Sequence, residues 1–487
     1  MASVLGKLNP KPVWHYFEEI CKYPHPSKKE EKLAAYIMKW AEEKGFESLT
    51  DKIGNIIIRK PATKGMENRK PVIIQGHIDM VCEKNSDVEF DFDNDSIQTY
   101  IDGDWVKAKG TTLGADNGIG VAMGMAVFDS KDIPHPPMEL LCTLDEETGL
   151  TGAGQLEPGL LKGEILINID SEEDGAFTIG CAGGMNTAAS FAYEADEIPA
   201  DSIAFQLAIK GCRGGHSGIE IHDGRANAAK ILNRILWNLT KKFNIKLSDF
   251  NSGSKHNAIP REAFATIVIS KAANGDFTKY IEDFSEILVA EWKTKEPNIN
   301  LSAVSVDLPQ RVMSSDMQRR VLNTFYAVAH GVMRMSPDIP GLVQSSTNFA
   351  IVETHENEVY VLTSQRSSIE SEKLNVAGKV RAAFELGGAT VTQGEGYPGW
   401  EPNIESPILK TAVNVFKDMF KKEPKIEAIH AGLECGLVSE KYPGMDMLSF
   451  GPNLVDVHSP DERIQISTVA NAWNLLLGVL KNIPEKA

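Results

Sequence analysis

Apolar and polar residues follow two different patterns along the first third of the chain. Apolar residues recur at helical spacing over 28–44, and the largely apolar segment 118–128 predicts a second helix. Short runs that are apolar on both faces predict strands at 55–60, 71–76, 138–144 and 164–169. Such runs are typical of a sheet that helices cover on both sides. The order strand–helix–strand therefore predicts a doubly wound α/β sheet.

The pattern changes after about residue 185. The segment 202–211 alternates between apolar and polar positions, which predicts a half-exposed strand. Further alternating strands and amphipathic helices follow, and this mixture predicts an α+β domain. A segment rich in Gly and Pro, 394–403, ends it as a return linker, after which the α/β pattern resumes. We expect one α/β domain in two parts, 1–185 and 398–487. An α+β domain, 186–397, is inserted between them.

The charge balance narrows the functional classes. The 487 residues include 50 Lys and Arg against 67 Asp and Glu, a net charge of −17. A nucleic-acid binder needs a basic face for the phosphates, so this balance argues against one. No run approaches the roughly 18 apolar residues of a membrane span, and no secretory signal is visible. The surplus of acid also argues against a membrane partner. The six cysteines are scattered and form no CxxC pair, so we expect reduced thiols in a cytoplasmic protein.

Residues that can bind a metal ion follow several of the predicted strands. His77 and Asp79 come directly after the strand in IIQGHIDMV, and Asp170 follows the strand in INIDSEEDG. Asp116 stands between glycines ahead of a predicted helix. Each has an ordinary alternative when taken alone, because a strand-end His or Asp is common and Asp116 could simply cap its helix.

Three adjacent carboxylates follow the strand MELLCT, at 145–147, and His458 lies in a downstream loop. The acidic triplet could be a solvated turn, but one Glu could also bind a metal while its neighbour acts as a base. Since the carboxyl ends of parallel strands converge on one crevice, the separate motifs predict a single site. Two histidines and three carboxylates suit two divalent cations that share one carboxylate. The five residues are His77, Asp116, Glu147, Asp170 and His458.

The motifs as a set resemble the M20 metallopeptidases. The segments GHID, LGADNGIG, DEETGL, NIDSEEDG and VHSPDE occur in the order and spacing of that family. Within it, GCAGG, KGCRGGHSG, HNAIPRE and HAGLECG are similar to the aminoacyl-histidine dipeptidases, also called cytosolic non-specific dipeptidases. The resemblance runs through nearly the whole chain and implies a two-metal hydrolase sheet, of the phosphorylase/hydrolase-like kind, with an inserted α+β lid domain.

The resemblance also implies roles for single residues. Asp116 would bridge two zinc ions, although manganese or cobalt could replace zinc, and a cis peptide bond would follow it. Glu146 would be the general base, and Asp79 would lie behind His77 or behind the bridging Asp116 and tune it. The remaining ligands would divide into two pairs, with His77 and Asp170 on one ion and Glu147 and His458 on the other. Asp rather than Glu at position 170 is similar to the di- and aminopeptidases of this superfamily.

The insert and the last segment supply further candidates. His216 lies in a Gly-rich turn, and the resemblance implies that it stabilises the oxyanion from the lid. Asn257 would lie near the substrate, Arg366 could hold a dipeptide carboxylate, and Glu434 could pair with the substrate ammonium group. The alternatives are an ordinary turn for Asn257, an exposed strand-end arginine for Arg366 and a helix N-terminal acid for Glu434.

The resemblance therefore implies a two-zinc dipeptidase of broad specificity whose substrates are small peptides, including Xaa-His dipeptides of the carnosine type. A related amidohydrolase or tripeptidase would use the same metals with a different pocket. A scaffold protein with a decayed site is a second alternative, which the intact ligand set and Glu146 argue against. The lid could close the site within one chain or pair two chains in a homodimer.

Overall fold

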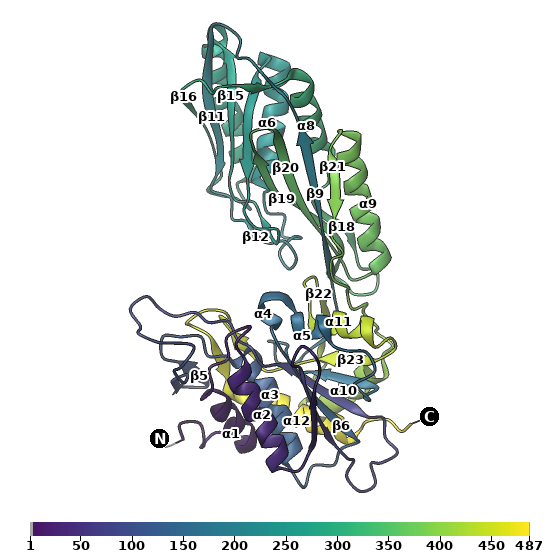
Figure 1. Cartoon of the computed structure of the whole chain (residues 1–487). Coiled ribbons are helices and arrows are strands. Elements are labelled where there is room, and N and C mark those ends of the chain that lie inside the picture. The colour runs from purple at the N-terminus through teal and green to yellow at the C-terminus, as the bar shows by residue number, and fades with distance from the viewer. Residues whose placement is uncertain (1–2, 487) are drawn as a thin grey trace. The chain divides into compact units, whose positions relative to one another are not determined.

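The computed structural model describes residues 3–486, which divide into two compact units. Unit 1 contains the chain up to Cys181, Trp400–Ala428 and the part from Leu433 onward. Unit 2 contains Ala182–Gly399 and Ile429–Gly432. In unit 1 the yellow C-terminal elements lie among the purple and blue N-terminal ones (Figure 1). Segments from both ends of the chain therefore build the first unit together.

Among the described residues, unit 1 is built on an eight-stranded sheet in the order β1-β2-β6-β3-β7-β23-β8-β22. β6, β3, β7 and β23 run parallel, whereas β1, β2 and β8 pair antiparallel with their neighbours. Every residue of β3, β6 and β7 is buried, as expected of runs that are apolar on both faces. The strands are β1 (Glu47–Thr50), β2 (Ile56–Lys60), β3 (Val72–His77), β6 (Met138–Thr143), β7 (Ile165–Asn168), β8 (Ala176–Cys181), β22 (Lys425–Ile429) and β23 (Asp446–Ser449).

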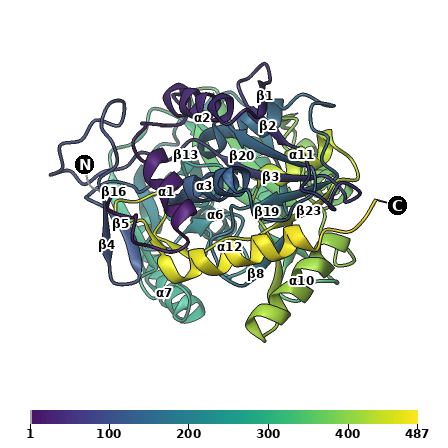
Figure 2. The same cartoon turned by 90° about the horizontal axis from the view of Figure 1, so that it is seen from below.

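Helices of unit 1 pack on this sheet and on one another. α3 lies against β3 and β6 with α1 packed on it, while α10 contacts both β23 and α12. Figure 2 shows α12 and α10 side by side. α10 is capped at its start, because the Ser406 hydroxyl accepts from the Leu409 N–H and Pro407 occupies the first turn. The helices are α1 (Lys11–Ile20), α2 (Glu31–Glu43), α3 (Ala115–Asp129), α4 (Glu146–Gly149), α5 (Thr151–Gln155), α10 (Pro407–Phe420), α11 (Glu434–Lys441) and α12 (Ile466–Lys481).

A small four-stranded sheet in unit 1, in the order β24-β25-β5-β4, joins distant parts of the chain. β25 pairs antiparallel with β5, so the segment after His458 is tied to the segment before Asp116. The strands are β4 (Thr99–Asp102), β5 (Trp105–Ala108), β24 (Leu454–Val455) and β25 (Arg463–Gln465).

Unit 2 is built on a nine-stranded sheet with the path β16-β11-β15-β13-β19-β20-β9-β21 and β18 paired with β19. All of these pairs are antiparallel. The strands are β9 (Gly183–Ala192), β11 (Ser202–Lys210), β13 (Lys246–Ser252), β15 (Ala263–Ser270), β16 (Asn300–Val306), β18 (Gly331–Met335), β19 (Val343–Thr354), β20 (Glu358–Ser367) and β21 (Thr390–Gln393). Two short pairs accompany them: β10 (Ala195–Asp196) with β17 (Val312–Met313), and β12 (Gly215–His216) with β14 (Ala258–Ile259).

Helices cover the sheet of unit 2 and bury a core of Phe, Ile, Leu and Val side chains. α6 packs on β11, β13, β15 and β19, and α9 packs on β9, β19, β20 and β21. The Asn227 side chain caps α6 by accepting from the Lys230 N–H at 3.1 Å. The helices are α6 (Ala228–Phe243), the short 3₁₀ helix Lys271–Ala273, α7 (Asn274–Trp292), α8 (Ser315–Ala327) and α9 (Glu370–Leu386). An α/β unit with an antiparallel α+β unit inserted in it confirms the predicted fold class, although the first sheet is mixed and only its centre is parallel.

No helix within residues 3–486 has the length and apolar character that a membrane span requires.

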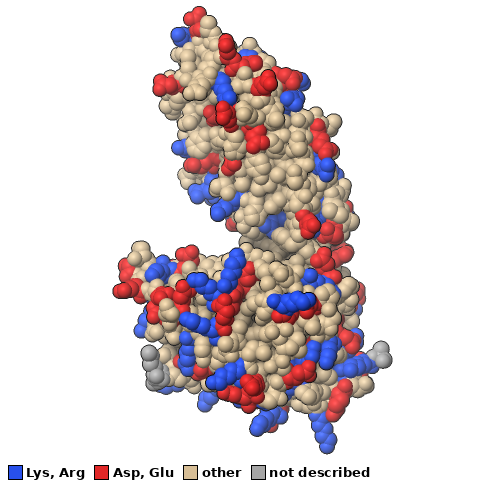
Figure 3. All heavy atoms as spheres, viewed as in Figure 1, with Lys and Arg blue, Asp and Glu red and all other residues tan. Residues whose placement is uncertain are grey.

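Acidic and basic side chains are interspersed over the face of the molecule that Figure 3 shows. A group of half-buried carboxylates in unit 1 lies beside two histidines, the buried His77 and the exposed His458.

Candidate metal centre

The five residues predicted as metal ligands lie together in unit 1. His77 is the last residue of β3, Glu147 follows β6 and Asp170 follows β7. Asp116 is at the start of α3, and His458 is in the loop between β24 and β25. Because β3, β6 and β7 are parallel neighbours, their carboxyl ends meet at one edge of the sheet.

Asp116 lies between the two histidines. Its Oδ1 is 3.0 Å from His77 Nε2, and its Oδ2 is 3.3 Å from His458 Nε2. The other carboxylates are on opposite sides, with Asp170 Oδ1 3.6 Å from His77 Nε2 and Glu147 Oε2 3.0 Å from His458 Nε2. The result is two groups, His77–Asp116–Asp170 and Asp116–Glu147–His458, each with ligand atoms within 4.8 Å of one another.

The electrostatics of these groups fit cations. Burial raises the pKa of Asp170 to about 7, and among the described residues its buried Oδ1 has no hydrogen-bond partner. Burial would lower the pKa of His77, yet the Asp170 and Asp116 carboxylates raise it well above its usual value. Hydrogen bonds to Asp116 and Glu147 raise the pKa of His458 to about 11. Buried carboxylates crowded around two imidazoles need positive charge to offset their repulsion, and a divalent cation in each group would supply it.

Asp79 lies behind His77, as expected, and also holds the next loop. Its Oδ1 is 3.3 Å from His77 Nδ1 and accepts the Glu146 N–H at 2.9 Å. Its Oδ2 accepts the Glu147 N–H at 3.2 Å and the Ser27 hydroxyl at 2.7 Å. One buried carboxylate therefore orients an imidazole and the turn that carries Glu146 and Glu147.

The three adjacent carboxylates after β6 point to different partners. Asp145, in a left-handed conformation with φ of 48°, accepts hydrogen bonds from the Thr148 and Thr151 hydroxyls. Glu147 faces His458, and Glu146 belongs to a third group of possible ligand atoms with His77 and Glu147. Burial raises the pKa of Glu146 well above its usual value. Glu146 is thus placed beside both candidate ion sites with a carboxyl group of increased proton affinity.

Asn117 ties the loop of Asp116 to the loop of Asp170. Its Nδ2 donates to the Ile169 carbonyl, and its Oδ1 packs between two glycines. A Cβ at Gly76 would lie 2.2 Å from that oxygen, and one at Gly120 would lie 2.4 Å from it. The two glycines therefore leave the space that Asn117 occupies. The peptide bond between Asp116 and Asn117 is cis, as the resemblance implied.

Two residues that support the centre were not found from the sequence. Ser27 donates to Asp79, and Glu30 Oε1 accepts the N–H groups of Lys28 and Asp145 at 2.9 and 3.0 Å. Both lie in a short polar segment ahead of α2, which has no pattern that indicates a site.

Glu434, at the start of α11, is buried in unit 1 with one oxygen free. Its Oε2 accepts from Gln75 Nε2 at 2.6 Å and from the Thr143 hydroxyl at 2.7 Å, whereas its Oε1 has no partner among the described residues. Gln75 in turn accepts from Asn168 Nδ2 at 2.6 Å. Burial raises the pKa of Glu434 to about 7. A buried carboxylate oxygen without a donor is suited to a cationic or N–H group of a ligand.

His216, in unit 2, is held as a neutral imidazole. Its Nδ1 accepts the backbone N–H groups of Gly218 and Ile219, each at 3.2 Å, and burial lowers its pKa to about 4. An accepting Nδ1 places the proton of the neutral ring on Nε2, which is then free to donate.

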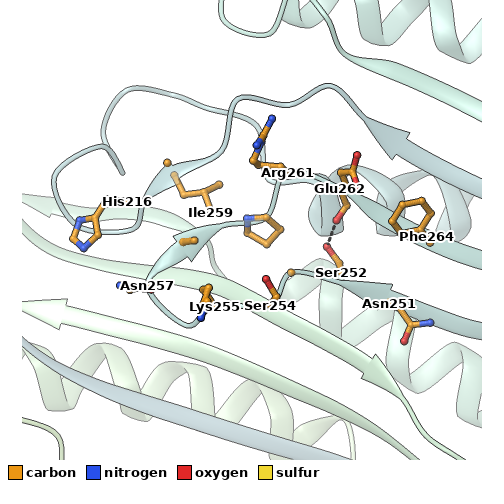
Figure 4. A pocket seen from close by; sticks show the side chains of 14 residues that line it. His216, Asn251, Ser252, Ser254, Lys255, Asn257, Ile259, Arg261, Glu262 and Phe264 are labelled. Carbon is orange, nitrogen blue, oxygen red and sulfur yellow. Dashed lines mark hydrogen bonds between the residues drawn. The ribbon is translucent and has the colours of Figure 1, made fainter. Parts of the chain in front are cut away.

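His216 and Asn257 both line a cavity of about 630 Å³ in unit 2 (Figure 4). They lie near each other because β12 pairs with β14 and the Ser217 N–H donates to the Asn257 carbonyl at 2.8 Å. Ser254, Lys255 and Arg261 add polar groups to the lining of this cavity.

Arg366, near the end of β20, is buried rather than exposed. Its side chain donates to the Tyr397 hydroxyl at 2.9 Å, while its Nε has no partner among the described residues. Tyr397 lies against Gly184, where a Cβ would come within 2.7 Å of the ring. A buried guanidinium with donor capacity left over is suited to an anionic group such as a carboxylate.

Buried histidines make the stability of unit 2 sensitive to acid. Burial lowers the pKa of His430 to about 3 and that of His330 to about 4, and His430 Nε2 is 2.7 Å from the Ser346 hydroxyl. Histidine in an unfolded chain has a pKa of about 6.5. At a pH between the folded and the unfolded pKa values, the unfolded chain binds more protons than the folded one, so the free energy of unfolding decreases as the pH falls. At pH 5 we expect His430 to lower the free energy of unfolding by about 2 kcal/mol relative to pH 7.

The measurement is amide hydrogen-exchange protection of β19 and β20 at pH 7 and pH 5, corrected for intrinsic rates. His430→Gln should reduce the pH-dependent loss of protection. The exposed His355, between the same two strands, serves as the control, and His355→Gln should leave the loss unchanged. Equal losses in wild type and His430→Gln would contradict the prediction.

Comparisons with known proteins find relatives along the whole chain. The family model for "Peptidase family M20/M25/M40" matches residues 73–482. The "Cytosol non-specific dipeptidase" of Escherichia coli (strain K12) is 44% identical over 484 residues, which cover 99% of this chain and 100% of that protein.

Solved structures give the same result. An aminoacylhistidine dipeptidase from Vibrio alginolyticus is 46% identical with a TM-score of 0.94, covering 100% of this chain and 99% of that one. An aminopeptidase PepT from Bacillus cereus ATCC 10987 is 16% identical with a TM-score of 0.57, covering 98% and 100% of the two chains, and shows likeness of fold alone. A family model that spans most of the chain, together with full-length relatives, confirms the family that the motifs predicted: the chain belongs to peptidase family M20/M25/M40.

Proposed function

We propose that this protein is a two-metal dipeptidase of broad specificity that accepts Xaa-His dipeptides. The observation that carries the proposal is the position of Asp116, whose two oxygens face two separate His and carboxylate groups with Glu146 beside both. The names of the relatives from Escherichia coli and Vibrio alginolyticus support the substrate class and a cytosolic location.

The donor set supports a pair of zinc, manganese or cobalt ions. His77 and Asp170 would hold one ion and Glu147 and His458 the other, with Asp116 shared between them. Nitrogen and carboxylate donors of this kind suit borderline divalent cations. When bound, the ions would polarise the peptide carbonyl and lower the pKa of a water molecule.

The side chains of unit 1 would manage the protons. Glu146 takes a proton from the attacking water on its carboxylate and returns it to the leaving amine nitrogen. Its burial and raised proton affinity support both halves of this exchange. Asp79 keeps the Glu146 carboxyl in place through the Glu146 N–H and orients His77 through Nδ1.

The remaining residues would bind the two ends of the substrate and the developing charge. The Nε2–H of His216 donates to the oxyanion that forms from the peptide carbonyl. Arg366 holds the substrate carboxylate with Asn257 near the substrate, and the free oxygen of Glu434 accepts the substrate ammonium group. These roles require unit 2 to act as a lid on unit 1, which is part of the proposal.

A panel of free and blocked dipeptides tests the substrate class. N-acetylation removes the group that pairs with Glu434, and amidation removes the group that pairs with Arg366. Because a buried partner left unpaired costs about 1–3 kcal/mol, each block should lower kcat/KM at least roughly tenfold. Better activity on N-acetyl amino acids than on dipeptides would identify an amidohydrolase instead.

Arg366→Ala tests the carboxylate role directly. We expect it to lose most of the preference for a free C-terminus while activity on the amidated dipeptide changes little. The control is Arg381→Ala on α9, whose guanidinium is exposed and pairs with Glu385. If wild type hydrolyses free and amidated dipeptides equally well, Arg366 does not bind the carboxylate.

A homodimer stays a prediction, which light scattering of the metal-loaded protein can test.

A further inference from the structure

A second buried carboxylate, Glu462, is bonded to the loop that carries Asp116. Its side chain is in the interior of unit 1, with only 2% of the residue exposed. Oε2 accepts the N–H groups of Leu113 and Gly114 at 2.7 and 3.1 Å. Oε1 accepts those of Ala115 and Asp116 at 2.8 and 3.4 Å. Four consecutive backbone N–H groups thus converge on one carboxylate.

These N–H groups have no partner of their own in the helix. They precede or begin α3, where the first N–H groups point away from the helix without a carbonyl to accept them. Leu113 and Ala115 are fully buried, so water does not replace the missing acceptors. Gly114 adopts a left-handed conformation, with φ of 71°, at the turn where these N–H groups converge on Glu462. The negative charge at the start of a helix adds a favourable interaction with its dipole.

The backbone of Glu462 belongs to the loop that carries His458. The Glu462 N–H donates to the Ser459 carbonyl at 3.0 Å, and the next residue, Arg463, begins β25. β25 pairs with β5, which anchors the peptide of Glu462 independently of its side chain. His458, four residues earlier, is in a left-handed conformation with φ of 61°. A single side chain therefore connects the loops of two residues in the group Asp116–Glu147–His458.

We propose that Glu462 is a positioning residue for the metal centre, which fixes the loop of Asp116 against the loop of His458 so that both face the same ion. Its oxygens are fully used by backbone N–H groups, so Glu462 is not itself a ligand. The inference rests on the proposed two-metal function. Glu462 supports the loop of Asp116 in the way that Asp79 supports the turn of Glu146 and Glu147.

The carboxylate chemistry of Glu462 makes the inference specific. Each oxygen accepts from two N–H groups, whereas Gln has one acceptor oxygen and would place its NH₂ against the other pair of donors. Asp keeps both oxygens on a side chain one methylene shorter. We therefore expect Glu to hold the loop of Asp116 best, Asp to hold it less well and Gln to hold it worst.

Zinc binding to the full chain tests the proposal with a readout other than activity. Metal-depleted Glu462→Gln is titrated with zinc by calorimetry, and metal content is measured after dialysis. We expect wild type to bind two ions and Glu462→Gln to bind the ion associated with His458 at least tenfold more weakly, with Glu462→Asp in between. Activity at saturating zinc should recover in part, because the ligands themselves are intact.

Glu139→Gln is the matched control. Glu139 is a buried carboxylate of the same unit whose Oε2 accepts the N–H groups of Lys162 and Gly163 at 2.7 and 2.8 Å, and it lies on β6 at the end away from the metal centre. Its replacement should lower the melting temperature while leaving both zinc affinities unchanged. If Glu462→Gln and Glu139→Gln bind zinc equally well, Glu462 has a structural role only and the proposal is overturned.

Three further results relate the inference to protein folding and to the proposed function. If Glu462→Gln does not fold, the zinc affinity of Glu462→Asp tests the positioning role in its place. Amide exchange of residues 113–116 in metal-loaded wild type is a second test, and fast exchange of those amides would overturn the proposal. If wild type binds two zinc ions but hydrolyses no dipeptide, the proposed substrate class fails and the positioning role still stands or falls on the zinc affinities. If wild type binds no second ion, both fail together.

Discussion

Replacement of Glu146 by Gln should lower kcat on a dipeptide by about two to four orders of magnitude, because proton transfer by a positioned carboxyl group contributes that much. Gln preserves the shape of the side chain but cannot accept the proton of the attacking water. The proposed ligands His77, Asp116, Glu147, Asp170 and His458 are untouched, so we expect both ions to remain bound. Steady-state kinetics of the zinc-loaded variant, with elemental analysis of the same sample, measure both quantities.

A matched control for this prediction is Glu173→Gln, which removes a carboxylate from an exposed position that pairs with Lys425. Its kcat should stay close to wild type. Near-normal turnover of Glu146→Gln with two ions bound would show that another group, or the metal-bound water alone, manages the proton.

Removal of the shared carboxylate should have the largest effect on metal content. Asp116 Oδ1 and Oδ2 face different histidines, so Asp116→Ala removes a ligand from both groups at once. Glu147→Ala removes a ligand from the group of His458, and Asp170→Ala removes one from the group of His77. We expect Asp116→Ala to retain less than one zinc ion per chain after dialysis, and each of the other variants to retain about one.

Metal analysis of the three variants under identical dialysis tests the shared position. Circular dichroism shows whether each variant is folded, which matters because Asp116 also lies in the first turn of α3. Two fully occupied sites in folded Asp116→Ala would rule out the bridging role, whatever the activity of the protein. Loss of both ions from Glu147→Ala would instead indicate that the two sites bind cooperatively.

The sequence was sufficient for the buried sheet and the residues at its edge. β3, β6 and β7 are apolar on both faces, and only strands covered on both sides bury such runs without cost. Parallel strands align their carboxyl ends, so His77, the carboxylates of 145–147 and Asp170 had to meet. Asp116 and His458 could be assigned to the same site because the motifs that contain them occur in the order and spacing of the M20 family. The same order and spacing identified the family.

The small sheet of β4, β5, β24 and β25 was not predicted. Its strands are two to four residues long, and an alternating pattern cannot be distinguished over so short a run. The pairing of β25 with β5 depends on contacts between residues more than 350 positions apart, and local sequence carries no record of them. Likewise, residues 429–432 belong to unit 2 although the segments on both sides belong to unit 1.

The sequence by itself determined which residue types gather at the carboxyl edge of the sheet, because the period of a strand and the direction of a parallel sheet follow from local pattern. Only the tertiary structure decided what each of them does. Asp145 turns to two threonines, Glu147 faces His458 and Glu146 lies beside His77 and Glu147, although three adjacent carboxylates look alike in sequence. Only the tertiary structure identified the supporting residues Ser27, Glu30 and Glu462. Each bonds to a group far along the chain, and such a contact depends on three-dimensional proximity and leaves no periodic signal in the sequence.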